Sequence, residues 1–317
     1  MLSAELNRSR GIGVEYEMCL PLVGTGGGND VQQVVARVLT ANGLPAIARG
    51  YSHAPLPAGI DLAVEYDGSV QGQSEFSGIT FHSVELKTRI LNGIDEWERI
   101  VPKALAICRY LGARVNRTCG HHVHLSLDEV TSDPRVLKSL FNLIHRFDNC
   151  IFSVVAPSRR TCGYAQPIPH QAKYLHGCRT LACFRRALTG WDRRTALNLT
   201  HVFEDSPHVE YRYHQGTLDA DKARHWLRMC LQLTEHSVKR NCQATTKQVE
   251  NSRSGLERLL VSCGFKVNAG IYAQVSPELR ETGRYLLKRY KAFNGPQSLR
   301  PSTSQATKHD ADARELA

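Results

Sequence analysis

The sequence predicts an α+β protein in which a sheet, apolar on one face and polar on the other, packs against helices. Three segments, residues 11–20, 122–127 and 208–214, carry this prediction because their apolar and polar side chains alternate strictly, as in half-buried strands. Longer stretches between them repeat apolar residues every three or four positions, as amphipathic helices do. With 317 residues and 42% hydrophobic composition, the chain can bury a sizeable core.

The composition of the chain excludes several classes of protein. No window approaches the roughly 18 uncharged apolar residues of a membrane-spanning helix, and Met1–Arg10 lacks the apolar stretch of a signal peptide. The ten cysteines are too dilute for a disulfide framework and include no CxxC pair. We therefore expect a cytoplasmic protein with reduced thiols and no membrane partner.

The net charge of +10 is concentrated in one segment. Residues 157–194 contain eight Lys or Arg against one acidic residue. Such a basic region fits a nucleotide as well as a nucleic acid. No zinc finger, helix-turn-helix or RNA-binding aromatic motif accompanies it, so charge alone leaves the partner open.

In the first predicted strand, Gly11–Leu20, Glu15 and Glu17 lie on one face and apolar residues on the other. Neighbouring carboxylates repel each other, which is unfavourable unless cations lie between them or the face is solvated. Both interpretations fit this strand alone. The glycine-rich residues 24–30 lack the GK[ST] of a phosphate loop, and we expect a turn that leads into a helix over residues 31–39.

A turn at Asp67-Gly68 separates two further alternating segments, residues 61–69 and 73–79. A hairpin of these segments would bring Asp67 and Glu75 to one end of the sheet. An aspartate in a turn commonly serves only the turn, whereas Glu75 has no such structural role.

Apolar periodicity over the remaining chain predicts helices and one more strand. We expect helices over residues 84–111, 131–155, 218–240, 243–263 and 277–293, and a strand over 196–203. The basic segment 157–194 predicts an irregular loop or lid with a short helix near Leu181–Leu188. Residues 294–317 are almost devoid of apolar side chains and predict a disordered tail, which leaves residues 1–293 as a single domain.

The segment Asn116–Leu127 has the most distinctive pattern of the chain. It alternates from His122 onward, so His122 and His124 point the same way, about 7 Å apart. Such a pair can hold a metal and the phosphate that the metal binds, although a surface strand can also carry two histidines without a function. His121 falls on the apolar side, and Cys119 is expected to pack rather than react.

Glu210, Arg212 and His214 share one face of the strand predicted over residues 208–214. Glu210 and Arg212 can form an ordinary ion pair. Beside a metal–phosphate site they can instead act as a ligand and a charge clamp.

Taken together, these motifs resemble the amidoligase branch of the glutamine synthetase/glutamate–cysteine ligase superfamily. The resemblance runs from about residue 11 to residue 230 and rests on Gly13–Glu17, Asp67–Ser69, Glu75–Ser77, Asn116–His124 and Glu210–Thr217. One departure is the absence of a proline that the family often has after the position of Ser77. The basic segment 157–194 matches only loosely.

The resemblance implies a curved antiparallel sheet with the active site on its concave face and helices on the other side. It also implies an ATP-dependent carboxylate–amine ligase. ATP would phosphorylate a carboxylate, of an amino acid, a glutamyl group or a peptide, and an amine would attack the acyl phosphate. This chemistry depends on positioning and on neutralising charge more than on covalent help from the protein.

Metal ligands follow from the resemblance by position. Two or three Mg²⁺ ions are expected, with Mn²⁺ as an alternative, on two ligand sets: Glu17, Asp67 and Glu75, and Glu15, His122 and Glu210. Histidine is an unusual ligand for Mg²⁺, which prefers oxygen, but the superfamily has one at the position of His122.

The expected nucleotide contacts also follow from the resemblance. Arg212 and Glu210 are the catalytic candidates, with Arg212 on the transferred γ-phosphoryl group. His124 is expected to contact an ATP phosphate. Arg194 and Asn198 are candidates for the nucleotide or the substrate carboxylate, with a solvated Arg194 as the alternative.

Two other functions fit parts of the pattern. A metal-dependent hydrolase or nuclease could use the two histidines and the carboxylates without ATP. A basic nucleic-acid-binding protein would explain the net charge, but it would have no use for clustered carboxylates.

Overall fold

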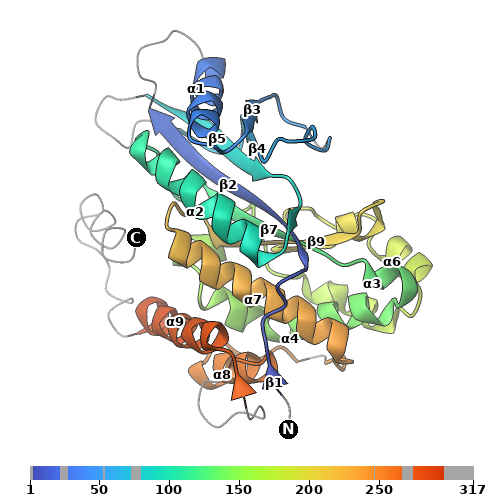
Figure 1. Ribbon diagram of the computed structural model, residues 1–317. Coiled ribbons are helices and arrows are strands. Elements are labelled where there is room, and N and C mark those ends of the chain that lie inside the picture. The colour runs from blue at the N-terminus through green and yellow to red at the C-terminus, as the bar shows by residue number, and fades with distance from the viewer. Residues whose placement is uncertain are drawn as a thin grey trace. The chain divides into compact units, whose positions relative to one another are not determined.

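The computed structural model describes residues 3–21, 28–52, 54–72, 80–245, 247–265 and 274–295 (Figure 1). Within these residues the chain divides into two compact units. The N-terminal unit comprises residues 8–123 and 215–223, and the C-terminal unit comprises residues 3–7, 124–214 and 224–295. Strand β7 (Gly120–Ser126) contributes residues to both.

The sheet of the N-terminal unit has the strand order β3-β4-β5-β2-β7, and β6 pairs with β2. Its other strands are β2 (Gly11–Pro21), β3 (Ala46–Ala48), β4 (Leu62–Glu65), β5 (Phe81–Thr88) and β6 (Leu91–Asn92). The pairs β2–β5, β4–β5 and β2–β6 are antiparallel, and β3–β4 is parallel. The predicted α+β class with a mainly antiparallel, curved sheet is confirmed.

The register of three strands separates an apolar row from an acidic row. Val64 of β4 faces Leu86 of β5, which faces Tyr16 of β2, and all three are at most 1% exposed. The next row joins Glu65, Glu85 and Glu17 in the same order. Because side chains alternate along a strand, the two rows point to opposite faces of the sheet.

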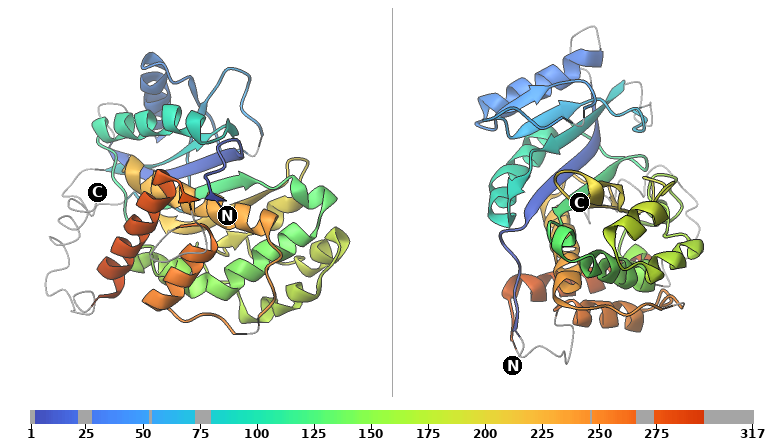
Figure 2. Two further views of the ribbon diagram at one scale, coloured as in Figure 1. Left: turned by 60° about the horizontal axis from the view of Figure 1, so that its bottom comes forward. Right: turned by 90° about the vertical axis from the view of Figure 1, so that its right-hand side faces the viewer.

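Two helices cover this sheet on one side, α1 (Gly28–Ala41) and α2 (Ile94–Tyr110) (Figures 1 and 2). The helix predicted over residues 84–111 is therefore wrong in its first part, which forms β5. Gly93 ends that part with a φ of 87°, and a Cβ there would lie 1.7 Å from the carbonyl oxygen of Arg8. Only glycine fits this left-handed, crowded position, so the helix begins after it.

The strands of the C-terminal unit follow the order β7-β9-β8, with β8 (Leu197–Asn198) antiparallel to β9 (His208–Gln215). A separate parallel pair joins β1 (Ser3–Ala4) to β10 (Gln274–Val275). The strand predicted over residues 196–203 is correct only for β8. A 3₁₀ turn, η2 (Thr200–Phe203), follows because Asn198 Oδ1 accepts the backbone N–H of Thr200 at 3.0 Å.

The helices of this unit match most of the predicted ones. They are α3 (Glu129–Ser132), α4 (Arg135–Phe152), α5 (Pro157–Arg160), α6 (Leu181–Ala187), α7 (Ala220–Lys239, whose first turn counts with the other unit), α8 (Arg253–Ser262) and α9 (Pro277–Asn294). The helix expected from residue 243 begins only at Arg253, where Ser252 Oγ accepts the N–H of Gly255 as a cap.

The basic segment 157–194 is held to the core rather than formed as one irregular loop. It contains α5, the 3₁₀ helix η1 (His170–Gly177) and the predicted short helix α6. The N–H of Ile168 donates to Asp148 Oδ2 of α4 at 3.1 Å. Asp148 Oδ1 accepts from the hydroxyl of the buried Tyr213 on β9 at 2.6 Å, so one carboxyl ties the segment, a helix and a strand together.

Four further expectations concern the cysteines, membrane-spanning helices, the single domain and the C-terminal tail. No disulfide joins the ten cysteines, although the sulfurs of Cys178 and Cys183 lie 2.6 Å apart, and the reduced state stays a prediction. None of the described helices has the length and apolar character that a membrane crossing requires. The single catalytic domain over residues 1–293 stays a prediction, and nearly all of the tail, residues 296–317, lies outside the described part.

Asp148 predicts a pH dependence of stability. Burial raises its pKa from 3.8 to about 7, so the folded state binds a proton that the unfolded state releases between these values. The contribution of Asp148 is fully present below about pH 4 and declines as the pH rises to about 7. Asp148→Asn should flatten the fall in unfolding free energy over this range, measured by urea denaturation. The exposed Asp205→Asn is the control, and an unchanged slope in Asp148→Asn would contradict the assignment.

Candidate active site

Three carboxylates converge on the polar face of the N-terminal sheet. Glu17 and Glu85 are cross-strand partners, and Asp67 follows the end of β4. Each offers an oxygen that lies within 4.8 Å of the oxygens of the other two. Asp67 also serves its turn, since its Oδ1 accepts the N–H of Ser69 at 2.6 Å.

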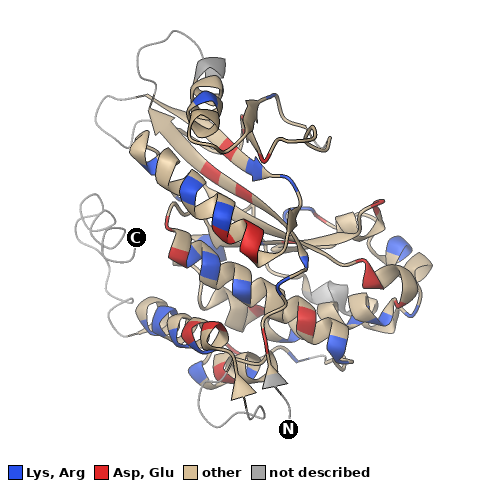
Figure 3. Cartoon of the chain, in the orientation of Figure 1, with Lys and Arg blue, Asp and Glu red and all other residues tan. Residues whose placement is uncertain are grey.

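A second group shares Glu85 with the first. It adds Glu15 and His122, and its ligand atoms also lie within 4.8 Å of one another. His122 Nδ1 is 2.9 Å from Glu15 Oε2, and its Nε2 is 3.6 Å from Glu17 Oε1. The imidazole of His122 is 2% exposed, so β7 holds it against both glutamates of β2. Figure 3 shows the acidic bands of β2 on this sheet.

Lys87 balances part of this negative charge. Its Nζ lies 3.0 Å from Glu85, 3.2 Å from Glu65 and 3.4 Å from Glu15. Burial would lower the pKa of Lys87, but these glutamates together raise it above the ordinary lysine value. Arg49 adds a second cation through its 2.7 Å contact with Glu65. Lys87 is thus a fixed positive charge in the acidic face.

Glu85 shows why this face suits a metal ion. Burial, together with the charges of Glu15, Asp67 and Glu17, raises the pKa of Glu85 well above its ordinary value, and Lys87 only partly opposes this. Its Oε2 is buried, and the cation beside it is Lys87, whose Nζ is 3.0 Å away. A divalent cation among these oxygens would reverse the repulsion. Carboxylate oxygens with one imidazole fit Mg²⁺ or Mn²⁺.

In the C-terminal unit Glu210 is surrounded by hydrogen-bond donors. Its buried carboxylate pairs with Arg212 Nη1 and accepts from Asn198 Nδ2 at 2.8 Å. His201 Nε2 and His124 Nε2 lie 3.8 and 3.9 Å from its oxygens. Asn198 reaches Glu210 because the two residues face each other in the β8–β9 pair.

A group of two histidines and a glutamate adjoins Glu210. His201, Glu204 and His208 place ligand atoms within 4.8 Å of one another, and the rings of His201 and His208 stack at 4.6 Å. Burial opposes the charge of His201, but hydrogen bonds to Glu210 and Glu204 outweigh burial and raise its pKa to about 9. Burial and the nearby His124 lower the pKa of His208. The stacked pair therefore combines one charged and one neutral imidazole at neutral pH.

The arginines Arg212 and Arg194 meet at Tyr164 of the basic segment. Arg212 Nε donates to the carbonyl oxygen of Tyr164 at 3.4 Å. The guanidinium of Arg194 lies 5.5 Å from the centre of the Tyr164 ring, and its side chain is exposed. The carbonyl oxygen of Arg212 accepts from the buried Arg159 Nη2 at 2.8 Å, which fixes β9 against α5.

The residues predicted from the sequence thus fall into two sets. Glu15, Glu17, Asp67 and His122 come together in the N-terminal unit, and His124, Arg194, Asn198, Glu210 and Arg212 lie in the C-terminal unit. Glu75 lies outside the described residues. A metal ion shared by Glu15, His122 and Glu210 stays a prediction. The packing roles of two residues are confirmed: His121 is fully buried and stacks on Tyr16 at 4.3 Å, and Cys119 is fully buried.

Sequence reasoning missed Glu85, Lys87, His201, Glu204 and His208. The sequence does contain a signal that could have placed Glu85 and Lys87 on a strand. Residues 84–87 alternate Val, Glu, Leu and Lys, which is the period of a strand and not that of the predicted helix. The histidines carry no comparable signal, because η2 and a turn separate His201 from His208.

Buried carboxylates, imidazoles and arginines gathered on the strands of an α+β fold are typical of an enzyme. The chain matches the model of the family described as "putative amidoligase enzyme" over residues 8–234 and belongs to this family. Membership of this family indicates an enzyme of the class that forms amide bonds. No curated protein matches the sequence. The hydrolase and nucleic-acid-binding alternatives are not favoured, and placement in the wider glutamine synthetase superfamily stays a prediction.

Glu85→Gln tests the acidic face. Because Glu85 belongs to both ligand groups, its loss should weaken Mn²⁺ binding by roughly 10- to 100-fold, measured by calorimetry. The metal-free variant should melt at a higher temperature than the metal-free parent, since a buried charge is removed from like charges. Glu5→Gln removes the same charge at an exposed position and should change neither value. Unaltered Mn²⁺ affinity in Glu85→Gln would refute the assignment.

Proposed function

We propose that the protein is an ATP- and Mg²⁺-dependent ligase that joins a carboxylate to an amine through an acyl phosphate. The supporting observation is the pair of ligand groups that share Glu85 on the polar face of the N-terminal sheet. Family membership supports the amide-bond chemistry. The carboxylate is expected to belong to an amino acid, a glutamyl group or a peptide.

In this proposal each ligand group holds one metal ion. Glu17, Asp67 and Glu85 hold the first, and Glu15, His122 and Glu85 hold the second. When bound, the ions would neutralise the phosphate oxygens of ATP and orient its terminal phosphoryl group. Glu85 takes the place that Glu75 has in the first set expected from sequence and that Glu210 has in the second. His122 is oriented by Glu15, whose Oε2 lies 2.9 Å from Nδ1.

Arg212 is the proposed clamp for the transferred phosphoryl group. Its guanidinium is oriented by Glu210 and by the carbonyl oxygen of Tyr164, and its side chain is 18% exposed. A guanidinium group held in this way can stabilise the negative charge that develops on the phosphoryl group without first having to reorient. His124 is proposed to contact a phosphate, and Asn198 holds Glu210 in place. Arg194, exposed beside Tyr164, is available to a substrate carboxylate.

The proposed reaction has two steps. A carboxylate oxygen of the substrate attacks the γ-phosphorus of ATP, and ADP leaves. The amine then attacks the acyl carbon, loses a proton and expels phosphate. Both steps develop negative charge on phosphate oxygens, which is the charge that cations and guanidinium groups stabilise.

Coupled release of ADP and phosphate tests the proposal. The purified protein with Mg²⁺ATP is assayed against pairs of amino acids, glutamyl peptides and amines. ADP release should require Mg²⁺, a carboxylate and an amine, and the new amide should appear in equal amount by mass spectrometry. Phosphodiester cleavage without ATP would instead support the hydrolase. Absence of ADP formation with every pair, together with absence of nucleotide binding, would reject the ligase.

Arg212→Ala separates binding from chemistry. Loss of the clamp should slow the phosphoryl step by roughly 10²- to 10³-fold, since charge stabilisation by one such donor is worth about 3–4 kcal/mol. The affinity for Mg²⁺ATP should change much less. Arg193→Ala, an exposed arginine of the basic segment, is the matched control and should retain full activity. Normal turnover in Arg212→Ala would show that another group stabilises the phosphoryl group.

A further inference from the structure

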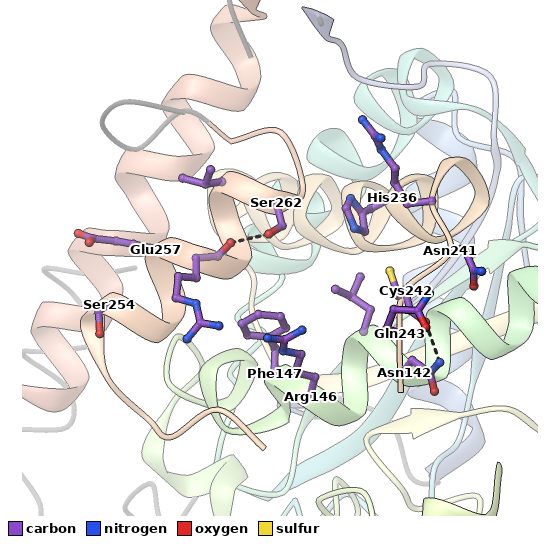
Figure 4. A pocket seen from close by; sticks show the side chains of 14 residues that line it. Asn142, Arg146, Phe147, His236, Asn241, Cys242, Gln243, Ser254, Glu257 and Ser262 are labelled. Carbon is purple, nitrogen blue, oxygen red and sulfur yellow. Dashed lines mark hydrogen bonds between the residues drawn. The ribbon is translucent and has the colours of Figure 1, made fainter. Parts of the chain in front are cut away.

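A pocket of about 680 Å³ opens in the C-terminal unit between α4, α8 and the end of α7. It shares no residue with the groups around Glu210. Figure 4 shows Arg146 and Phe147 of α4 facing the pocket together with His236 of α7 and Ser262 of α8. Its volume is in the range of small-molecule sites, about 300–1,000 Å³.

Three arginines line this pocket, each from a different part of the chain. Arg146 comes from α4, Arg240 follows α7 and Arg258 lies on α8. Within the described residues none of them has a carboxylate at ion-pair distance. Arg146 is half-buried and the other two are exposed. Three arginines that line one cavity give it a positive charge that favours an anionic ligand.

The acidic side chains near the pocket form ion pairs with cations other than the three lining arginines. Among the described residues that line the pocket, Glu257 is the one carboxylate; it accepts from Arg253 Nε at 2.8 Å and points away from the other lining residues in Figure 4. Glu235 lies 3.6 Å from Lys239. Burial and the charge of Arg240 lower the pKa of His236, so its ring is neutral at neutral pH. The pocket therefore keeps a positive charge of about three from its arginines.

One wall of the pocket is held in place by hydrogen bonds. Ser139 Oγ of α4 donates to the carbonyl oxygen of Arg240 at 2.5 Å and accepts the N–H of Cys242 at 2.9 Å. Asn142 Nδ2 donates to the carbonyl oxygen of Cys242 at 2.7 Å. These bonds fasten the chain after α7 to α4, so the site is preformed, which lowers the entropic cost of binding.

The remaining lining sets the chemistry of the ligand. Leu143 and Phe147 are each 4% exposed and form an apolar floor, and the guanidinium of Arg146 lies 5.5 Å from the centre of the Phe147 ring. Guanidinium groups bind phosphate oxygens in pairs of parallel hydrogen bonds and carry the charge that a dianion needs. Apolar side chains and arginines in the lining of one pocket suit an anion with an organic part. We propose that this pocket binds a small phosphomonoester.

The test uses phenyl phosphate as the probe, by calorimetry on the full chain with EDTA present so that no metal-dependent nucleotide site contributes. Arg146→Gln and Arg258→Gln should each weaken binding by roughly tenfold, the value of one charge-assisted contact. Arg280→Gln on α9, an exposed arginine that does not line the pocket, removes an equal charge and should leave the affinity unchanged. Inorganic phosphate should bind more weakly than phenyl phosphate because it cannot cover the apolar floor.

Several results would overturn the proposal. One is equal loss of affinity in Arg280→Gln and Arg146→Gln, which would indicate attraction by the general surface charge. Another is full affinity in the double variant Arg146→Gln/Arg258→Gln, which would place the ligand elsewhere. Tighter binding of triglutamate than of phenyl phosphate would replace the phosphomonoester by an acidic peptide. Failure of millimolar phenyl phosphate to bind the unaltered protein would also reject the site.

Discussion

The crowding of carboxylates on one face of the N-terminal sheet is the constraint on which the candidate site depends. Two carboxylate charges 4.8 Å apart repel by about 3 kcal/mol at an effective dielectric constant of ~20. Glu17, Glu85 and Asp67 meet this condition together, and Glu17 and Glu85 are nearly excluded from water. Lys87 and Arg49 offset part of the repulsion. Among the described residues of this face acids nevertheless outnumber bases, which is the electrostatic setting of a cation site.

The register of the sheet specifies the site and the core together. The β2–β5–β4 pairing that aligns Glu17, Glu85 and Glu65 also aligns Tyr16, Leu86 and Val64 in the adjacent row. A slip by one residue would turn the carboxylates toward the helices and the apolar row toward water. Burial of the apolar row therefore keeps the carboxylates close together despite their repulsion. The stability of the core supports an arrangement that the carboxylates alone would not adopt.

Much of this could be predicted from the sequence, for reasons that are local. The alternation in β2, β7 and β9 places Glu15, Glu17, His122, Glu210 and Arg212 on polar faces without knowledge of the fold. The role of Glu85 is not predicted because the apolar spacing over residues 84–111 indicates one continuous helix, whereas Gly93 breaks the segment. The sequence does not predict His201 as a site residue, and it does not predict the contact of Asn198 with Glu210. Both contacts with Glu210 arise from the pairing of β8 with β9 and from η2. The residue pattern of a single strand does not predict which other strand will pair with it.

Glu210 and Glu85 are both buried glutamates on sheets, yet their surroundings divide their roles. The oxygens of Glu210 are occupied by Arg212 and Asn198, with two imidazoles nearby, so protein donors stabilise its charge. Glu85 instead faces other carboxylates, and these and its burial raise its pKa. A cation stabilises Glu85 more than Glu210, since at Glu210 it would compete with a guanidinium already in place. The same residue type thus favours a metal ion on one strand and positions an arginine on another.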